Sequence, residues 1–204
     1  MSNNKLHNSR CVMIVSGPSG SGKSTLCDQL IKDDVNLELS ISYTSRDQRP
    51  MEREGKDYHF LSKNVFQKMI DDGSMLEYTE IYGNYYGSPK ETIRINSLNN
   101  KDTLFDIESK GARFIKTQIP NETFTVFVMP SDISELENRL KLRGRETEEE
   151  IKIRLSNAKK EIEQSLFYDY VVKNDDFLVA LADLKSILRA ERLKAFRITK
   201  DFCR

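Results

Sequence analysis

Gly17-Pro18-Ser19-Gly20-Ser21-Gly22-Lys23-Ser24-Thr25 is the stretch that decides the fold. Its spacing, G-x-x-x-x-G-K-[ST], is that of a phosphate-binding loop, in which glycines let successive backbone N–H groups turn inward around an anion. The residues before it, 11–16, are apolar or small and predict a strand, and 26–31 predict a helix. We expect all nine residues to bind a nucleoside triphosphate, with Lys23 on its β- and γ-phosphates and the Ser24 hydroxyl on magnesium.

The composition limits the class of protein. The 204 residues suffice for one domain with insertions. Lys+Arg and Asp+Glu both number 32, so no overall field attracts nucleic acid or membrane. No apolar run approaches the roughly 18 residues that a membrane span needs. Residues 1–10 are polar and are expected to form a disordered tail rather than a signal peptide. Three cysteines outside any C-x-x-C pair are typical of reduced thiols in a cytoplasmic protein.

Apolar patterning beyond the loop predicts alternating strands and helices. Residues 103–108 and 123–129 are continuous apolar runs, typical of strands covered on both faces in α/β proteins, and 170–172 form a last strand. Helices are expected over 89–96, 111–118, 132–143, 147–166 and 177–196. We therefore predict an α/β fold, a P-loop NTPase core with a parallel sheet flanked by helices. That core is assigned to residues 11–38, 90–139 and 166–204.

Two inserts interrupt the alternation. The first, residues 39–89, predicts a small mixed acceptor-binding unit. Its expected parts are a strand over 37–43, a charged loop over 44–57, a strand over 58–61, a helix over 65–72 capped by Asn64, and a strand over 75–82 that turns at Gly83-Asn84. The second insert, residues 140–165, is a highly charged helical arm with a capping box at Thr147–Glu150, and we interpret it as a lid.

The first insert carries candidate phosphate ligands. Arg46 and Arg49 lie three residues apart, and Tyr58, Tyr85 and Tyr86 flank their loop. Guanidinium groups match phosphate oxygens in bidentate fashion. The alternative is a solvated loop with core tyrosines, but next to a phosphate-binding loop we favour the clamp.

Carboxylates form a second group of candidates. Glu77, with Ser42 and Ser88 nearby, could accept the N1–H and N2–H of guanine, which adenine lacks at that edge; spacing alone favours a surface strand residue. Asp106 and Glu108 occupy alternate positions at the end of a buried strand and so face the same side, where α/β proteins bind ligands. Asp106 could orient magnesium through its waters and Glu108 could touch the acceptor, or both could cap the next helix.

Arginines mark the second insert. Arg139 and Arg143 share one helix face and Arg154 follows, so the three could neutralise charge on a transferred phosphoryl group. They could equally pair with nearby glutamates, and we expect both, with those pairs holding the lid open. The chain has only two histidines, so a general base is scarce. This suits a phosphate group as the acceptor, because a phosphate is already anionic near pH 7 and needs no general base. His59 is expected to pack beside Tyr58.

Taken in order, these motifs resemble those of guanylate kinases. They run from about Val12 to Asp176 and comprise GPSGSGKST, S-I-S-Y-T-S-R-x-x-R, G-K-D-Y-x-F, L-E-Y, G-N-Y-Y-G-S, D-I-E, R-L-x-x-R-G-R-x-T-E-E-E-I-x-x-R-L and V-x-N-D-D. The resemblance implies that MgATP and GMP, and also dGMP, react to give ADP and the diphosphate in purine nucleotide metabolism. It implies ATP and Mg²⁺ as cofactors and no nucleic-acid or membrane partner, and it leaves a homo-oligomer open.

The resemblance also implies roles for individual residues. The GMP phosphate is held by Arg46, Arg49, Tyr58 and Tyr86. Guanine is surrounded by Ser42, Glu77, Ser88 and Glu108. The transferred phosphoryl is served by Lys23, Arg46, Arg139, Arg143 and Arg154, and Asn174 lies near the ATP adenine.

The chain departs from the usual family pattern in a few places. In the charged loop over 44–57, Met51 stands where family members usually have glycine. Glu108 stands where they usually have the shorter Asp, and Ser109-Lys110 where they commonly have an apolar residue followed by Gln. The segment 194–204 is extra.

Three other functions remain alternatives on the residues alone. A guanylate-kinase-like binding module without catalysis is disfavoured, because such modules typically lack an intact phosphate-binding loop and lid arginines, and this chain has both. Another P-loop kinase is disfavoured by the Glu77 strand and the G-N-Y-Y-G-S turn. A GTPase switch needs guanine-reading motifs on the core that we do not find.

Overall fold

The computed structural model describes residues 10–143 and 147–202, without the side chains at 139, 142, 143 and 200–202. Within these residues a five-stranded parallel sheet forms the centre of the molecule. Its strands in spatial order are β2 (Leu37–Leu39), β7 (Asp102–Asp106), β1 (Val12–Ser16), β8 (Thr123–Pro130) and β9 (Tyr170–Asn174). The predicted α/β core with a parallel sheet is confirmed. The predicted disordered tail lies almost wholly outside the described residues.

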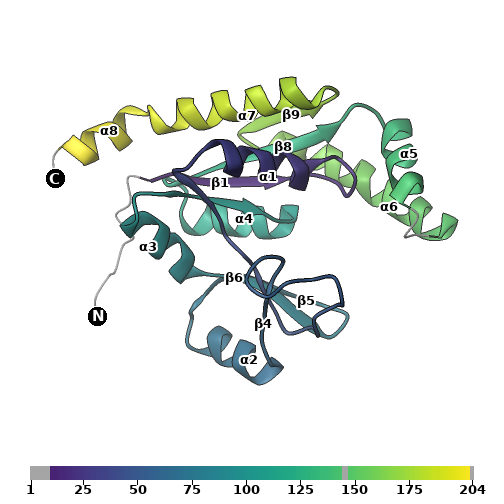
Figure 1. Cartoon of the computed structure of the whole chain (residues 1–204), viewed down its shortest axis with the longest axis horizontal. Helices are drawn as coiled ribbons and strands as arrows, with labels where there is room; N and C mark the ends of the chain where they lie inside the picture. The colour runs from purple at the N-terminus through teal and green to yellow at the C-terminus, as the bar shows by residue number, and fades with distance from the viewer. Residues whose placement is uncertain (1–9, 144–146, 203–204) are drawn as a thin grey trace.

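Helices cover both faces of this sheet (Figure 1). On one face α1 (Lys23–Asp33) and α7 (Phe177–Arg192) pack on the strands, and on the other α3 (Lys90–Leu98) and α4 (Ser109–Gln118) do so. Every residue of β1 is buried, because its alternate side chains enter the two apolar clusters in turn. Each large apolar side chain buried there stabilises the fold by about 1.5–3 kcal/mol.

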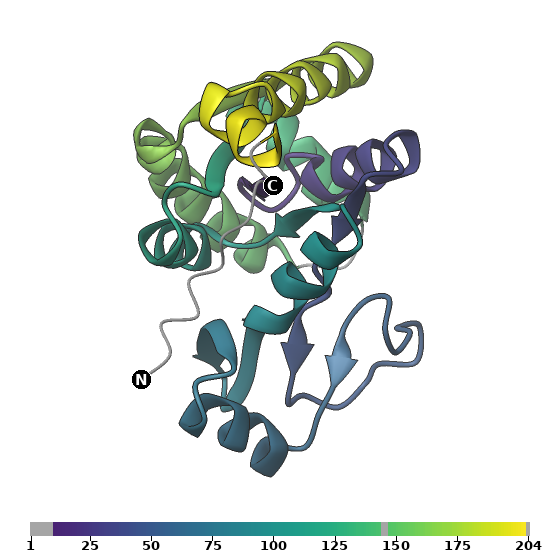
Figure 2. The same cartoon turned by 90° about the vertical axis from the view of Figure 1, so that its left-hand side faces the viewer.

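A smaller sheet lies to one side of the core (Figure 2). Its strands in spatial order are β4 (His59–Phe60), β3 (Tyr43–Thr44), β6 (Asn84–Pro89) and β5 (Met75–Ile81), with α2 (Lys63–Asp71) beside them. The pairing is mixed, parallel between β3 and β4 and antiparallel elsewhere, as predicted. We call residues 43–89 the flap. Leu76 of β5 is buried against Ala112 and Ile115 of α4, which ties the flap to the core.

Two further helices follow β8. These lid helices, α5 (Ile133–Arg143) and α6 (Glu148–Glu163), bury Leu136, Leu140, Ile151 and Ala158 in a small cluster of their own. The predicted capping box is present, since the Thr147 hydroxyl accepts the Glu150 N–H and the Glu150 carboxylate accepts the Thr147 N–H. A short 3₁₀ helix (Gln164–Phe167) leads from α6 toward β9.

Several expected boundaries were wrong. The predicted strand 37–43 is two strands in different sheets, because the chain leaves the core at Ser40, whose N–H donates to the Leu104 carbonyl at 2.8 Å. The cap of α2 is Ser62 rather than Asn64, since the Ser62 hydroxyl accepts the N–H of Val65 at 3.3 Å. His59 packs edge-on against Tyr43, its partner across the strands, rather than beside Tyr58.

The end of the chain also differs from the prediction. The helix expected over 177–196 ends at Arg192, and α8 (Ala195–Phe202) follows as a separate helix. Arg197 of α8 is only 3 % exposed and donates to the carbonyls of Arg10 and Glu122, both at 3.0 Å. These contacts give the extra C-terminal segment a structural role, since α8 packs at the end of the sheet where the inner strands β1 and β8 begin.

Candidate active site

The loop between β1 and α1 has the backbone that its glycines allow. Gly17 and Gly22 have φ values of +153° and +86°, conformations that L side chains rarely adopt. A Cβ on Gly17 would lie 2.3 Å from the carbonyl oxygen of Val128, so this position has no room for a side chain. Gly22 precedes α1 without a side-chain cap, and the first N–H groups of a helix lack intrahelical partners. The loop therefore offers backbone donors to an anion.

Asn174 supports this loop from behind. It is buried at the end of β9, and its side-chain amide donates to the carbonyl oxygen of Ser21 at 2.7 Å. It is not among the described residues that line the cavity over the loop. The contact with adenine implied by the resemblance therefore stays a prediction, and the structure adds a positioning contact that sequence reasoning missed.

We expect Asn174→Ala to lower the free energy of unfolding by about 1–3 kcal/mol, because the buried Ser21 carbonyl loses its donor. Affinity for ATP should fall with it as the loop loosens. Thermal unfolding and titration with an ATP analogue measure the two effects, with the exposed Asn99→Ala as control. Unchanged stability and unchanged nucleotide affinity would show that this hydrogen bond does not hold the loop.

A cavity of about 630 Å³ lies over the loop, between it and α6. The sequence-predicted residues that line it are Gly17, Pro18, Ser19, Gly20, Gly22, Lys23, Ser24, Thr25, Glu108 and Arg154. Lys23 forms a salt bridge with Asp106, and Arg154 of α6 donates to the Ser19 hydroxyl at 2.8 Å. Lys23 and Arg154, from separate segments of the chain, thus meet at one cavity, which also has Glu108, Glu150 and Glu161 in its wall.

Oxygen atoms that could act as magnesium ligands lie beside the same loop. The Ser24 hydroxyl donates to Asp106 Oδ2 at 2.7 Å, so a hydroxyl and a carboxylate oxygen are within reach of one ion. Mg²⁺ prefers oxygen ligands and is commonly held by one or two protein groups together with substrate phosphates. In the described part of the chain no group of three or more His, Cys, Asp and Glu could form a protein cage. The pair fits an ion that arrives with a nucleotide.

A second cavity, of about 770 Å³, lies between the flap and α4. It is lined by the predicted residues Ser42, Tyr58, Glu77, Tyr86, Asp106 and Glu108. Glu77 is 9 % exposed, and its Oε1 accepts a hydrogen bond from the fully buried Ser88 hydroxyl at 2.9 Å. Burial raises the pKa of Glu77 and the charge of Glu108 adds to the rise, whereas the bonds from Ser88 oppose it. Glu77 lines this cavity, and a carboxylate there is suited to a ligand that brings N–H donors.

Gly111 lets α4 approach that carboxylate. A Cβ at Gly111 would lie 3.2 Å from Glu77 Oε2, tighter than ordinary contact. Spacing gave no sign of this neighbour.

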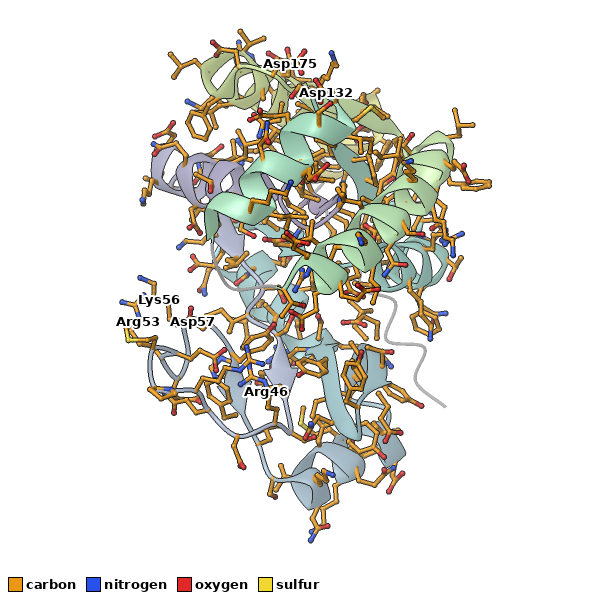
Figure 3. The ribbon with its side chains drawn as sticks, turned by 90° about the vertical axis from the view of Figure 1, so that its right-hand side faces the viewer. Arg46, Arg53, Lys56, Asp57, Asp132 and Asp175 are labelled. Atoms are coloured by element: carbon orange, nitrogen blue, oxygen red, sulfur yellow. The ribbon has the colours of Figure 1, made fainter. Side chains whose placement is uncertain are left out.

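Arg46 lies on the flap (Figure 3), next to Tyr58, which lines the second cavity. Its guanidinium is 5.5 Å from the ring centroid of Tyr58, which in turn packs edge-on against Tyr86. Glu52 binds the guanidinium through two hydrogen bonds of 2.8 Å. Sequence reasoning missed Glu52 as a partner, because nothing in a charged loop shows which charges meet. Hydrogen bonds from Arg46 lower the pKa of Glu52 to about 2.

The Glu52 shift predicts a pH dependence. A carboxyl pKa of about 2 in the folded protein, below the ordinary 4.5, means that ionised Glu52 stabilises the fold above pH 4.5. That contribution is lost as the pH falls from 4.5 through 2. We expect Glu52→Gln to be less stable than wild type by a constant amount between pH 8 and pH 6, and the gap to shrink on acidification. Urea unfolding across this range measures it, and a gap that widens below pH 4 would contradict the assignment.

Other predicted residues lie apart from the cavities. Arg49 is exposed on the flap loop, where its backbone N–H donates to Glu52 at 2.9 Å. Farther out on the same loop, Figure 3 shows Arg53, Lys56 and Asp57. Ser21 and Ser88 are buried behind the cavity walls. The side chains of Arg139 and Arg143 lie outside the described residues.

The glycine-built loop between β1 and α1, at the edge of a parallel sheet and next to a second nucleotide-sized cavity, defines a P-loop phosphotransferase. Residues 9–191 match the family model described as guanylate kinase. The chain belongs to the guanylate kinase family, and it is a kinase. No helix among the described residues is long and apolar enough to span a bilayer.

Similar proteins cover nearly the whole chain. A guanylate kinase of Vibrio cholerae is 46 % identical over 184 residues, 89 % of this chain and 88 % of its own length. One of Rickettsia prowazekii is 43 % identical over 192 residues, 94 % of this chain and 97 % of its own. The crystal structure of guanylate kinase from Anaplasma phagocytophilum superposes with a TM-score of 0.74 at 30 % identity, covering 92 % of this chain and 89 % of that one.

Proposed function

We propose that this kinase binds ATP in the cavity over residues 17–25 and GMP in the flap cavity, and that it transfers the γ-phosphoryl group to give ADP and GDP. The observation that carries the proposal is the shared wall of the two cavities at the end of β7. Glu108 lines both cavities, and Asp106, which lines the flap cavity, binds Lys23 and Ser24 of the loop. ATP in the first cavity and GMP in the second would meet there with their phosphate groups facing each other, as in-line phosphoryl transfer requires.

Guanine is assigned to the Glu77 side of the flap cavity. A carboxylate there accepts the N1–H and N2–H of guanine, while Ser88 holds the carboxylate in place. Ser42 and Glu108 complete the surroundings of the base. We extend the proposal to dGMP, because these contacts reach the base and not the ribose 2′-hydroxyl.

The acceptor phosphate is assigned to Arg46, Arg49, Tyr58 and Tyr86. Glu52 and the Asp47 carbonyl occupy three of the five donors of the Arg46 guanidinium and so orient it. Arg49 is exposed and must turn inward to take part. Because the acceptor phosphate is already ionised near pH 7, no general base is assigned.

The transferred phosphoryl is assigned to Lys23, Arg154, Arg139 and Arg143, with Arg46 on the acceptor side. Ser24 would hold Mg²⁺ directly and Asp106 through water, and the ion neutralises charge on the phosphates when it is bound. The lid (140–165) and the insert (39–89) are proposed to close on the core (11–38, 90–139 and 166–204). Closure excludes water and so suppresses hydrolysis of ATP. Cys11 and Cys27 are free buried thiols, which suits the cytoplasm, where we place the enzyme.

The test is ADP release, coupled to a second enzyme, with GMP, dGMP, AMP, UMP, CMP or dTMP as acceptor. We expect GMP and dGMP to accelerate release by orders of magnitude and the others to have little effect, because only guanine brings the two donors that Glu77 accepts. Release that no nucleotide accelerates would favour a binding module without catalysis. Acceleration by another monophosphate instead would move the assignment to a different nucleotide kinase.

A further inference from the structure

The tip of the β5–β6 hairpin exposes an aromatic side chain. Ile81 pairs with Asn84, so Tyr82 and Gly83 are the central residues of the turn rather than the predicted Gly83-Asn84. Their φ values are +49° and +74°, the left-handed pair that this tight turn requires. Asn and Gly adopt such values more easily than tyrosine does. Tyr82 is 99 % exposed, so its ring contributes nothing to the packing of the flap.

Tyr82 nevertheless lines the cavity over the phosphate-binding loop. Tyr82 belongs to the flap, whereas most of that cavity is formed by the loop and by α6 of the lid. On α6 the same cavity is lined by Ile153, which is 58 % exposed. Among the described residues lining this cavity, Tyr82 and Ile153 are the two large apolar side chains exposed to water. Each comes from one of the segments proposed to move.

We propose that Tyr82 packs against Ile153 when the flap and lid close, and that this contact couples the binding of GMP to the binding of ATP. The proposal rests on the function assigned above, with GMP on the flap side and ATP on the lid side. A contact that forms only when both segments close makes each nucleotide raise the affinity for the other by the same factor. Hiding roughly 40–60 Å² of apolar surface corresponds to about a five- to tenfold change in affinity. Tyr82 and Ile153 are thus positioning residues.

The test is a double-mutant cycle read out as coupling between ligands. The dissociation constant of the non-hydrolysable analogue AMP-PNP with Mg²⁺ is measured by calorimetry with and without saturating GMP. We expect GMP to tighten binding to the wild type, and Tyr82→Ala and Ile153→Ala each to reduce that effect about five- to tenfold. The double variant should lose no more than either single variant. Tyr82→Phe should behave as wild type, since the ring and not the hydroxyl makes the contact.

The matched control is Val179→Ala on α7, which is also 58 % exposed but lines neither cavity. It should leave the coupling unchanged, and all variants should keep the melting temperature of the wild type. The proposed contact would be overturned by independent losses that multiply in the double variant, by a Tyr82→Phe loss equal to that of Tyr82→Ala, or by a wild type without coupling. Absence of GMP-dependent ADP release from the wild type would overturn the proposed function, and the proposed contact with it.

Discussion

Replacing Lys23 with alanine is expected to lower kcat by roughly 10³-fold or more while the protein stays folded. Removing a single donor that stabilises transition-state charge commonly costs about 10²–10³ in rate. Lys23 should exceed that range, because its loss also leaves the Asp106 carboxylate without its cation, next to the phosphates. The measurement is GMP-dependent ADP release with both nucleotides saturating.

Lys32→Ala is the control for Lys23→Ala. It removes the same charge from an exposed position in the last turn of α1 and should leave kcat within about twofold. Melting temperatures of both variants check the fold. If Lys23→Ala kept a tenth of the wild-type kcat, Lys23 of the phosphate-binding loop would not stabilise the transferred phosphoryl group as proposed.

Glu77→Gln should lower kcat/KM for GMP by roughly 10²–10³-fold and leave KM for ATP within about twofold. In the proposed site the carboxylate accepts two N–H donors of guanine, whereas the side-chain amide of glutamine would place its own N–H group against one of them. Stability should not fall, because burial raises the pKa of Glu77 and the ionised form is therefore a cost to the fold at neutral pH. Steady-state kinetics with each nucleotide varied in turn gives both constants.

The same substitution should change a pH profile. If GMP binds ionised Glu77 as proposed, its affinity should rise as the pH rises through the elevated pKa, and Glu77→Gln should flatten that rise. Glu80→Gln, at an exposed position of the same strand, serves as the control and should leave both constants unchanged. Equal losses toward GMP and ATP would remove Glu77 from the guanine site.

The core was predictable because its three central strands, β7, β1 and β8, are almost entirely buried. Continuous apolar runs such as 123–129 can be recognised in the sequence, and the glycine loop fixes where the first strand turns into a helix. The exit from the core at Ser40 was not predictable, since alternation continues from β2 into β3 although the strands belong to different sheets. The break after Arg192 was hidden for a similar reason, because the helical pattern resumes in α8.

Site residues were predictable where a short sequence motif identifies them. Lys23 and Ser24 belong to such a motif and line a cavity. The spacing around Glu77 favoured a surface strand residue, and only the family resemblance indicated that it faces a ligand, whereas it is buried and lines the second cavity. Support from elsewhere in the chain was not predictable. The hydrogen bond from Asn174 to Ser21 spans 153 residues, and the closeness of Gly111 to Glu77 follows from how α4 packs on the flap. No spacing rule encodes such contacts, since the fold must place them first.

A crystal structure with GMP, Mg²⁺ and a non-hydrolysable ATP analogue would show directly where the two nucleotides bind. We expect guanine N1 and N2 within hydrogen-bonding distance of Glu77, the acceptor phosphate beside Arg46, Tyr58 and Tyr86, and the triphosphate on residues 17–25, with the γ-phosphate in line with the acceptor phosphate. Guanine bound away from Glu77, or an acceptor phosphate pointing away from the loop, would contradict the proposed function.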